Sequence, residues 1–92
     1  MKYNEILNKI LDLGFNIIKE IEENNYFKLE NKNMVATLFI NDNKCRLTLV
    51  NKVEIDNWDE PYYYEWMNEN NVNNKFEEFL KFFNKHNINK LK

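Results

Sequence analysis

The sequence predicts an α+β fold in which two helices flank an antiparallel β-meander of about four strands. Two stripes of apolar residues at helical spacing lie near the two ends of the chain. Between them, apolar and polar residues alternate in short runs that are divided by asparagine-rich turns. We therefore expect a two-layer molecule with strand order 1-2-3-4, in which the helices and one apolar face of the sheet form the core.

Length and composition predict one domain inside a cell. A chain of 92 residues is long enough for one hydrophobic core, so residues 1–92 are predicted to form a single domain. Asparagine accounts for 19 residues, whereas glycine, proline and arginine each occur once, a bias typical of a gene from an AT-rich bacterium or its phage. Cys45 has no disulfide partner, and the chain shows neither a signal-peptide pattern nor an apolar run of about 20 residues. We expect a cytoplasmic location in a host bacterial cell.

The net charge of −2 is unevenly distributed along the chain. Residues 53–74 carry six acids and no base, whereas residues 75–92 carry five bases and two acids. An acidic segment of this kind disfavours contact with nucleic-acid phosphates and favours a partner with a basic surface.

The first helix is predicted over residues 3–13. Its apolar stripe consists of Tyr3, Ile6, Leu7, Ile10, Leu11 and Leu13. Gly14 suits the left-handed residue that ends a helix, and Phe15 is placed to contact the preceding turn. The alternative is one helix that continues to about Asn24, because three further isoleucines keep helical spacing. We favour the end at Gly14, followed by a strand over residues 15–22.

The next strands can be placed in register on one another. A two-residue turn at Asp42-Asn43 pairs Ile40 with Cys45 and Leu38 with Leu47, so that these four apolar side chains share one face. On the other face the same register pairs Thr with Thr and Val with Val, which are favourable cross-strand neighbours.

Two more turns extend this register towards the N-terminus. A turn at Lys32-Asn33 pairs Phe27 with Leu38, and a three-residue loop over 23–25 pairs Ile21 with Phe27. Lys19 then lies on the apolar face, where it does not fit.

The second face of the sheet is predicted to be mostly polar. Tyr26, Val35, Phe39 and Val50 interrupt it, and these residues are either scattered surface side chains or a contact patch.

The structure of the segment Asp56–Glu69 is ambiguous in the sequence. The fourth strand is expected to continue through Val53 and Ile55 before it. Asp59 before Glu60-Pro61 suits a helix start, whereas residues 62–66 have the aromatic composition of a fifth strand. A loop or short helix and a strand are both consistent with this segment.

The last helix is the clearest element. Asn74 and Glu77 have the spacing of a capping box, and the helix is expected to end near His86. Its apolar stripe consists of Phe76, Phe79, Leu80 and Phe83.

No residue pattern points to catalysis, a metal or a cofactor. His86 is the only histidine and has no second histidine or cysteine near it in sequence. Cys45 is predicted to be a buried structural residue, since no histidine is placed to activate it. The single glycine excludes a glycine-rich phosphate loop. We expect no enzyme, no cofactor and no metal site.

The segment Asp56–Glu69 is the candidate partner-binding site. It contains both tryptophans, three of the five tyrosines and five carboxylates, but no lysine or arginine. Tyrosine and tryptophan dominate binding hot spots, and carboxylates steer a surface towards a basic target. The candidate residues are Asp56, Trp58, Asp59, Glu60, Tyr62, Tyr64, Glu65, Trp66 and Glu69. The alternative is that Trp58, Tyr63, Trp66 and Met67 cover the sheet and complete the core.

In size, AT-rich composition, helix–sheet–helix plan and acidic–aromatic segment, the chain resembles the small acidic phage-encoded inhibitors of bacterial immunity, notably anti-CRISPR proteins. The resemblance implies a stoichiometric inhibitor that blocks a host nuclease complex, such as a CRISPR effector, at a nucleic-acid-binding surface. Two other functions remain open, namely an immunity or antitoxin partner of a dedicated toxin and a small nucleic-acid-binding protein. We expect no membrane partner, direct nucleic-acid binding is the less favoured mode, and an exposed edge strand leaves a homodimer open.

Overall fold

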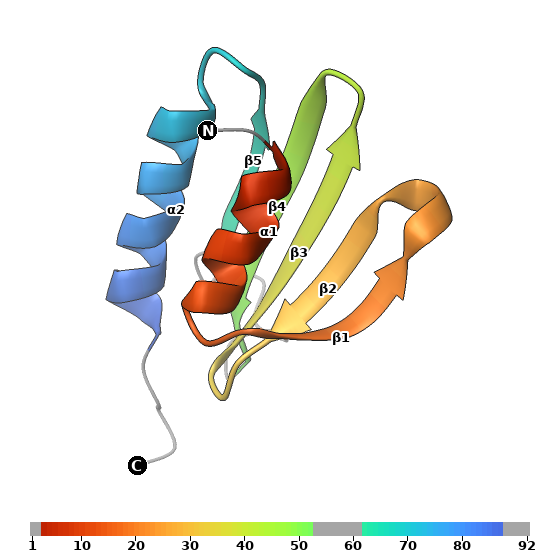
Figure 1. Cartoon of the computed structure of the whole chain (residues 1–92). Helices are drawn as coiled ribbons and strands as arrows, with labels where there is room; N and C mark the ends of the chain where they lie inside the picture. The colour runs from red at the N-terminus through yellow and green to blue at the C-terminus, as the bar shows by residue number, and fades with distance from the viewer. Residues whose placement is uncertain (1–2, 53–61, 88–92) are drawn as a thin grey trace.

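The structure is a computed structural model that describes residues 3–52 and 62–87 (Figure 1). The described helices and strands are α1 (Tyr3–Asp12), β1 (Asn16–Ile21), the 3-10 turn η1 (Glu22–Asn24), β2 (Tyr26–Glu30), β3 (Met34–Asn41), β4 (Lys44–Asn51), β5 (Tyr63–Met67) and α2 (Val72–His86). The strands form one antiparallel sheet in the order β1-β2-β3-β4-β5. The predicted α+β fold is confirmed, with a fifth strand added at the β4 edge.

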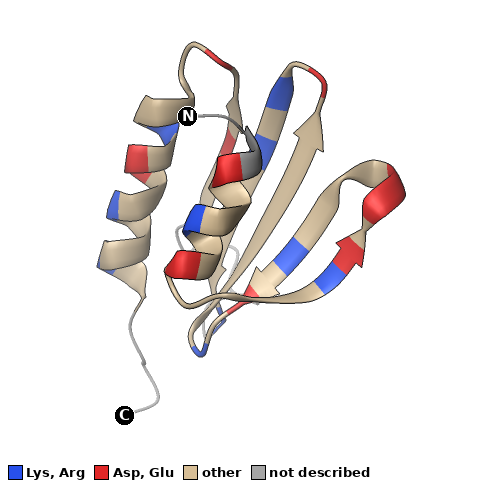
Figure 2. Ribbon diagram, viewed as in Figure 1, with Lys and Arg blue, Asp and Glu red and all other residues tan. Residues whose placement is uncertain are grey.

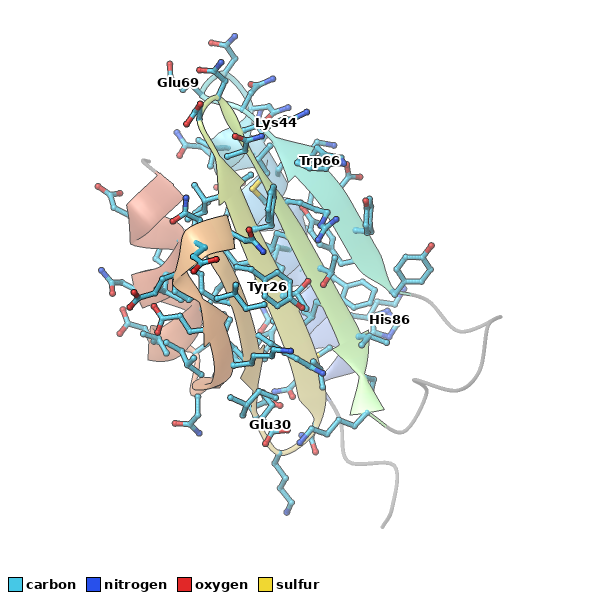
Figure 3. All side chains as sticks on the ribbon, turned by 90° about the vertical axis from the view of Figure 1, so that its right-hand side faces the viewer. Tyr26, Glu30, Lys44, Trp66, Glu69 and His86 are labelled. Carbon is cyan, nitrogen blue, oxygen red and sulfur yellow. The ribbon has the colours of Figure 1, made fainter. Side chains whose placement is uncertain are left out.

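Both helices lie on the same side of the sheet. Figure 1 shows α1 in front of the sheet and α2 beside it, and Figure 3 shows α2 behind the sheet and α1 at its left edge. The core between these two layers consists of Ile6, Ile10, Phe15, Leu29, Met34, Ala36, Leu38, Cys45, Leu47, Leu49, Tyr63, Met67, Val72, Phe76, Phe79 and Phe83. Neither described helix is long and apolar enough to span a membrane.

Helix α1 ends where the sequence predicts. The N–H groups of Leu13 and Gly14 donate to the carbonyls of Ile10 and Leu11, at 3.1 and 3.0 Å. Gly14 has a φ of +98°, a left-handed conformation that glycine adopts without a Cβ clash. The chain then enters β1, so the continuous helix to Asn24 is excluded.

The registers of the two central hairpins are confirmed. Ile40 lies opposite Cys45 and Leu38 opposite Leu47, as the two-residue turn at Asp42-Asn43 requires. Phe27 lies opposite Leu38 in the β2–β3 hairpin. In the connection between β2 and β3, the Asn31 side chain accepts hydrogen bonds from the backbone N–H groups of residues 33 and 34.

The predicted pairing of Ile21 with Phe27 is wrong by one residue. Ile21 pairs with Tyr26 instead, because η1 adds Glu22 to the connection and Asn25 closes it with a φ of +50°. A bulge between residues 17 and 19 then shifts the register of β1. This shift places Lys19 opposite Lys28, so the lysine does not lie on the apolar face.

The ambiguous segment contains a strand rather than a helix over Tyr63–Met67. Strand β5 pairs with β4 through Leu49–Tyr63 and Cys45–Met67, among other pairs. Strand β4 itself is described to Asn51. The predicted continuation through Val53 and Ile55 lies outside the described residues.

The capping box predicted at Asn74 is wrong, because α2 begins one turn earlier with Asn71 as its N-cap. The Asn68 side chain accepts hydrogen bonds from the backbone N–H groups of Asn70 and Asn71, at 2.8 and 3.1 Å. These hydrogen bonds form the turn between β5 and α2, so the chain has changed direction by residue 71. The helix therefore begins at Val72, whose side chain is buried. The end of α2 at His86 is as predicted, and the Asn51 side chain donates to the His86 carbonyl at 2.7 Å.

Candidate protein-binding face

The side of the sheet opposite the helices is the candidate functional site, and we call it the open face. Successive side chains of a strand point to opposite sides, so every second residue of each strand belongs to this face. Its members are Asn16, Lys19, Ile21, Tyr26, Lys28, Glu30, Val35, Thr37, Phe39, Asn41, Lys44, Arg46, Thr48, Val50, Tyr64 and Trp66. Figure 3 views the open face directly and labels Tyr26, Glu30, Lys44 and Trp66 on it.

One row of paired residues crosses the open face from β2 to β5. Tyr26 lies opposite Phe39, Phe39 opposite Arg46, and Arg46 opposite Trp66. The Phe39 and Trp66 rings meet edge to face, with centroids 6.3 Å apart. The next row is polar at its centre, where the Thr37 and Thr48 hydroxyls share a hydrogen bond.

Arg46 lies among three aromatic rings. Its Cζ atom is 5.5 Å from the Phe39 centroid, 5.7 Å from the Trp66 centroid and 5.9 Å from the Tyr64 centroid. The Lys44 ammonium lies over the Trp66 ring at 4.7 Å. These are cation–π distances, so the rings hold both cations against the sheet.

The open face is basic within the described part of the chain. Figure 2 shows basic segments on β2 and at the start of β4, which are Lys28, Lys44 and Arg46. None of these three forms an ion pair with a described carboxylate, and Glu30 is neutralised by Lys52 at 2.9 Å. The face therefore combines rings with positive charge that the described residues leave uncompensated.

Three of the predicted site residues are exposed aromatics. Tyr64 and Trp66 lie on the open face with 48% and 38% of their surface accessible, and Tyr62, just before β5, is 64% accessible. Asp56, Trp58, Asp59 and Glu60 lie outside the described residues, so their predicted role in binding stays a prediction.

The two described acids of the predicted site lie away from these rings. Glu65 is directed to the helix side and pairs with Lys75 of α2 at 3.4 Å, while Glu69 is exposed in the turn before α2. Desolvation lowers the pKa of the Lys75 ammonium, but attraction to Glu65 and Glu78 outweighs it, so this pKa is raised. Among the described residues, the structure therefore brings the predicted rings together with cations and not with these acids.

The alternative in which part of the segment covers the sheet is confirmed for Tyr63 and Met67, which are buried. The Tyr63 ring packs edge to face on Phe79, and its hydroxyl donates to the Lys75 carbonyl at 2.7 Å. Burial, followed by the nearby carboxylate Glu65, raises the pKa of Tyr63 above its usual range. Trp66 points the other way, so the segment supplies rings to both sides of the sheet.

The contribution of Arg46 and Lys44 to the site could not be found from their sequence positions alone. The Phe39–Arg46 pair is visible in the predicted hairpin register, but the contact of both cations with Trp66 requires β5 to pair with β4. The sequence feature that does point to this part of the site is the set of four apolar residues that interrupt the polar face. Two of them, Tyr26 and Phe39, belong to the row of paired residues that leads to Arg46 and Trp66.

Among the described residues, neither His86 nor Cys45 belongs to a chemical site. The His86 ring packs on Phe82 with centroids 4.4 Å apart, and no group of three His, Cys, Asp or Glu side chains in the described ranges is placed to hold a metal ion. Cys45 is fully buried, and desolvation raises the pKa of its thiol to about 11. A protonated, inaccessible thiol is not a nucleophile at neutral pH.

The fold and the face define a small α+β protein in which the side of the sheet opposite the described helices carries aromatic rings and cations. No family model, curated protein or solved structure gives a significant match to this chain. The open face itself is therefore the feature of the molecule that bears on function.

Proposed function

We propose that this chain is a small protein-binding inhibitor that acts by occupying a surface of its partner through the open face. The observation that supports this most directly is the exposure of Tyr62, Tyr64 and Trp66 beside a sheet face that neither described helix covers. Exposed aromatics gathered on one face are more typical of an interface than of ordinary surface.

Strand β5 makes these rings suitable for binding. Its hydrogen bonds to β4, together with Tyr63 and Met67 on the inner side, fix the backbone from which Tyr64 and Trp66 project. Tyrosine and tryptophan have few rotatable bonds, so little side-chain entropy is lost when such a preorganised surface binds.

The target that we propose is a host defence nuclease complex of the kind that anti-CRISPR proteins block, and the gene source that we propose is a phage or mobile element. The acids Asp56, Asp59 and Glu60 support this target, because they precede Tyr62 closely in sequence and no basic residue lies among them. Acids next to rings suit a basic groove that normally holds nucleic acid, since carboxylates there take the place of phosphates.

The first experiment tests whether the rings bind. The double variant Tyr64→Ala/Trp66→Ala and the wild-type chain would be used to capture partners from a bacterial extract, with identification by mass spectrometry. We expect the wild type to capture a nuclease complex and inhibit its cleavage of DNA, and the double variant to lose both. The control is Lys81→Gln, which changes an exposed residue on the helix layer. Equal capture by the wild type and the double variant would exclude the open face as the interface.

The second experiment tests the acids. Asp59→Lys/Glu60→Lys should weaken the same complex at least tenfold, on the order of 1.4 kcal/mol, by placing like charges opposite a basic target. Glu65→Lys is the comparison, because it breaks the contact with Lys75 on the helix side and should alter stability more than binding. Unchanged affinity of the first variant would remove the acids from the site.

A second candidate function is binding of single-stranded nucleic acid, favoured by the uncompensated cations Lys28, Lys44 and Arg46 on an aromatic sheet face. Against it, the cations already lie over the rings on which bases would stack, and the chain as a whole is acidic. A gel shift at low salt with an oligothymidylate separates the two candidates, since a retarded band supports the nucleic-acid function.

A further inference from the structure

Arg46 is the only arginine in the chain and lies on the open face, opposite Phe39 and Trp66. It belongs to β4, which has β3 on one side and β5 on the other. Its side chain is half-buried, with the rings of Phe39, Tyr64 and Trp66 around the guanidinium. These three neighbouring rings restrict the side chain, so Arg46 is preorganised before any partner arrives.

The charge of this guanidinium is not compensated within the described residues. No described carboxylate lies within ion-pair distance of it, and its Nε atom is buried without a hydrogen-bond acceptor. Lys44 adds a second unpaired cation across the Trp66 ring. Buried polar groups ordinarily have hydrogen-bond partners, so this position is one where an anion from outside would be stabilised.

The arrangement of rings and cations favours a carboxylate over a nucleobase as the group that binds. A base stacks on the free face of a ring, but Lys44 lies over Trp66, and Arg46 lies near all three rings. A carboxylate needs only the planar donors of arginine, and the surrounding rings exclude water from the pair.

We infer that the open face docks an acidic segment of a protein partner, with a carboxylate of that segment seated on Arg46 and assisted by Lys44. This inference rests on the proposed protein-binding function and specifies the chemical group of the partner that contacts Arg46.

The single arginine provides a direct test by NMR, because the chain has one Arg Nε–Hε signal. The probes are an oligoglutamate peptide, an oligolysine peptide and an oligothymidylate, each titrated into the ¹⁵N-labelled full chain at low salt. We expect oligoglutamate alone to move the Arg46 signal saturably. An unmoved signal would overturn the inference, and a shift with oligothymidylate at much lower concentration would assign the site to nucleic-acid phosphate instead.

Variants separate the geometry of arginine from its charge. Arg46→Lys keeps the charge but loses the planar donors, and we expect it to weaken oligoglutamate binding by about tenfold. Lys81→Gln removes one positive charge from the exposed side of α2 and should change the affinity by less than about twofold. Equal weakening by both variants would show a non-specific charge effect and overturn the assignment to Arg46.

Capture of the partner distinguishes failure of this inference from failure of the proposed function. If Tyr64→Ala/Trp66→Ala abolishes capture and Arg46→Lys leaves it intact, the carboxylate site is wrong and the protein-binding face stands. If neither variant changes capture, the proposed function itself is wrong. Amide spectra of each variant establish that the sheet is folded before either conclusion is drawn.

Discussion

At the scale of single residues, β5 divides its side chains between the buried core and the open face by simple alternation. Tyr63 and Met67 face the helices and are buried, whereas Tyr64 and Trp66 face outwards beside Arg46. A one-residue slip of this strand would exchange the two sets. Adjacent tyrosines therefore have opposite roles, which makes Tyr63 and Tyr64 a matched pair for substitution.

We predict that Tyr63→Phe lowers the free energy of unfolding by about 1 kcal/mol. The change removes the hydroxyl that donates to the Lys75 carbonyl at 2.7 Å and keeps the ring that packs on Phe79. Tyr64→Phe is the control and should change stability by less than about 0.5 kcal/mol, because this ring is exposed. Urea denaturation measures both, and equal effects would contradict the inward role of Tyr63.

The buried thiol of Cys45 predicts a loss of stability in alkaline solution. Burial raises the pKa of this thiol from 9.0 to about 11, so the unfolded chain releases the proton first as the pH rises. The unfolded state then binds fewer protons, and stability falls between pH 9 and 11. The pKa of Tyr63 is also raised from the ordinary value of 10.0, so its hydroxyl adds to the fall in stability above that pH.

The measurement is the free energy of unfolding of the wild type and of Cys45→Ala from pH 8 upwards. We expect the slope between pH 9 and 10 to be steeper in the wild type than in Cys45→Ala, by at most about 1.4 kcal/mol per pH unit, the limit for one proton. If the free energy of unfolding changes with pH at the same slope in both proteins, the Cys45 thiol has the same pKa in the folded and unfolded states, which contradicts the prediction.

At the scale of elements, the hairpins were predictable where cross-strand chemistry constrained both faces at once. Opposed Thr and Val pairs on one face and apolar pairs on the other leave a single register for β3 and β4. The β1–β2 connection lacked such a constraint, since its register depends on the left-handed Asn25 and on a bulge. Neither feature has a distinctive residue pattern in a chain with 19 asparagines.

The candidate site was predictable in part for the same reason. The exposure of Tyr62 and Tyr64 and the burial of Tyr63 follow from strand alternation. The presence of Arg46 beside Trp66 follows from the β4–β5 pairing, which joins residues 20 positions apart in sequence through a connection of no distinctive length. Local propensity carries no information on such a contact.

The junction of α1 and β1 gives a prediction at this scale. Gly14→Ala should lower the free energy of unfolding by about 1–2 kcal/mol, because alanine is strained at a φ of +98°. Beyond Gly14 and its two chain neighbours, no described atom lies within 4 Å of the added Cβ, so the loss would come from the backbone conformation and not from a clash with packed side chains. Asn8→Ala, at an exposed position within α1, is the control and should be neutral or slightly stabilising. Thermal unfolding followed by circular dichroism compares the two, and an unchanged midpoint for Gly14→Ala would contradict the strained conformation.

At the scale of the whole molecule, the sheet separates a core side, which the described helices cover, from the open face, which they do not cover. Both helices contribute to one core, in which Ile6 and Ile10 of α1 and Phe79 and Phe83 of α2 are buried with the inner sheet residues. The ring of Phe15, which lies shortly after α1, packs on the ring of Phe83 in α2, with centroids 5.7 Å apart, and so links the two helical segments. Changes to the open face therefore leave the core intact, which is what allows binding and stability to be tested apart.

This shared core predicts that α1, the sheet and α2 unfold together in one transition. In a Trp58→Phe background, fluorescence reports Trp66 on β5, while far-ultraviolet circular dichroism reports mainly the helices. We expect the two urea midpoints to coincide, because the helices have no core of their own.

Phe79→Ala tests the same coupling by removing a fully buried ring of α2 that packs on Tyr63 and Phe76. It should lower the free energy of unfolding by about 3–5 kcal/mol and move both midpoints to the same lower urea concentration. Tyr62→Ala changes the most exposed of the three aromatic residues near the open face. It should alter the free energy of unfolding by less than about 0.5 kcal/mol. Loss of the helical signal before the Trp66 signal, in either the wild type or the Phe79 variant, would show that α2 is an independent unit and that residues 1–92 do not unfold as a single domain.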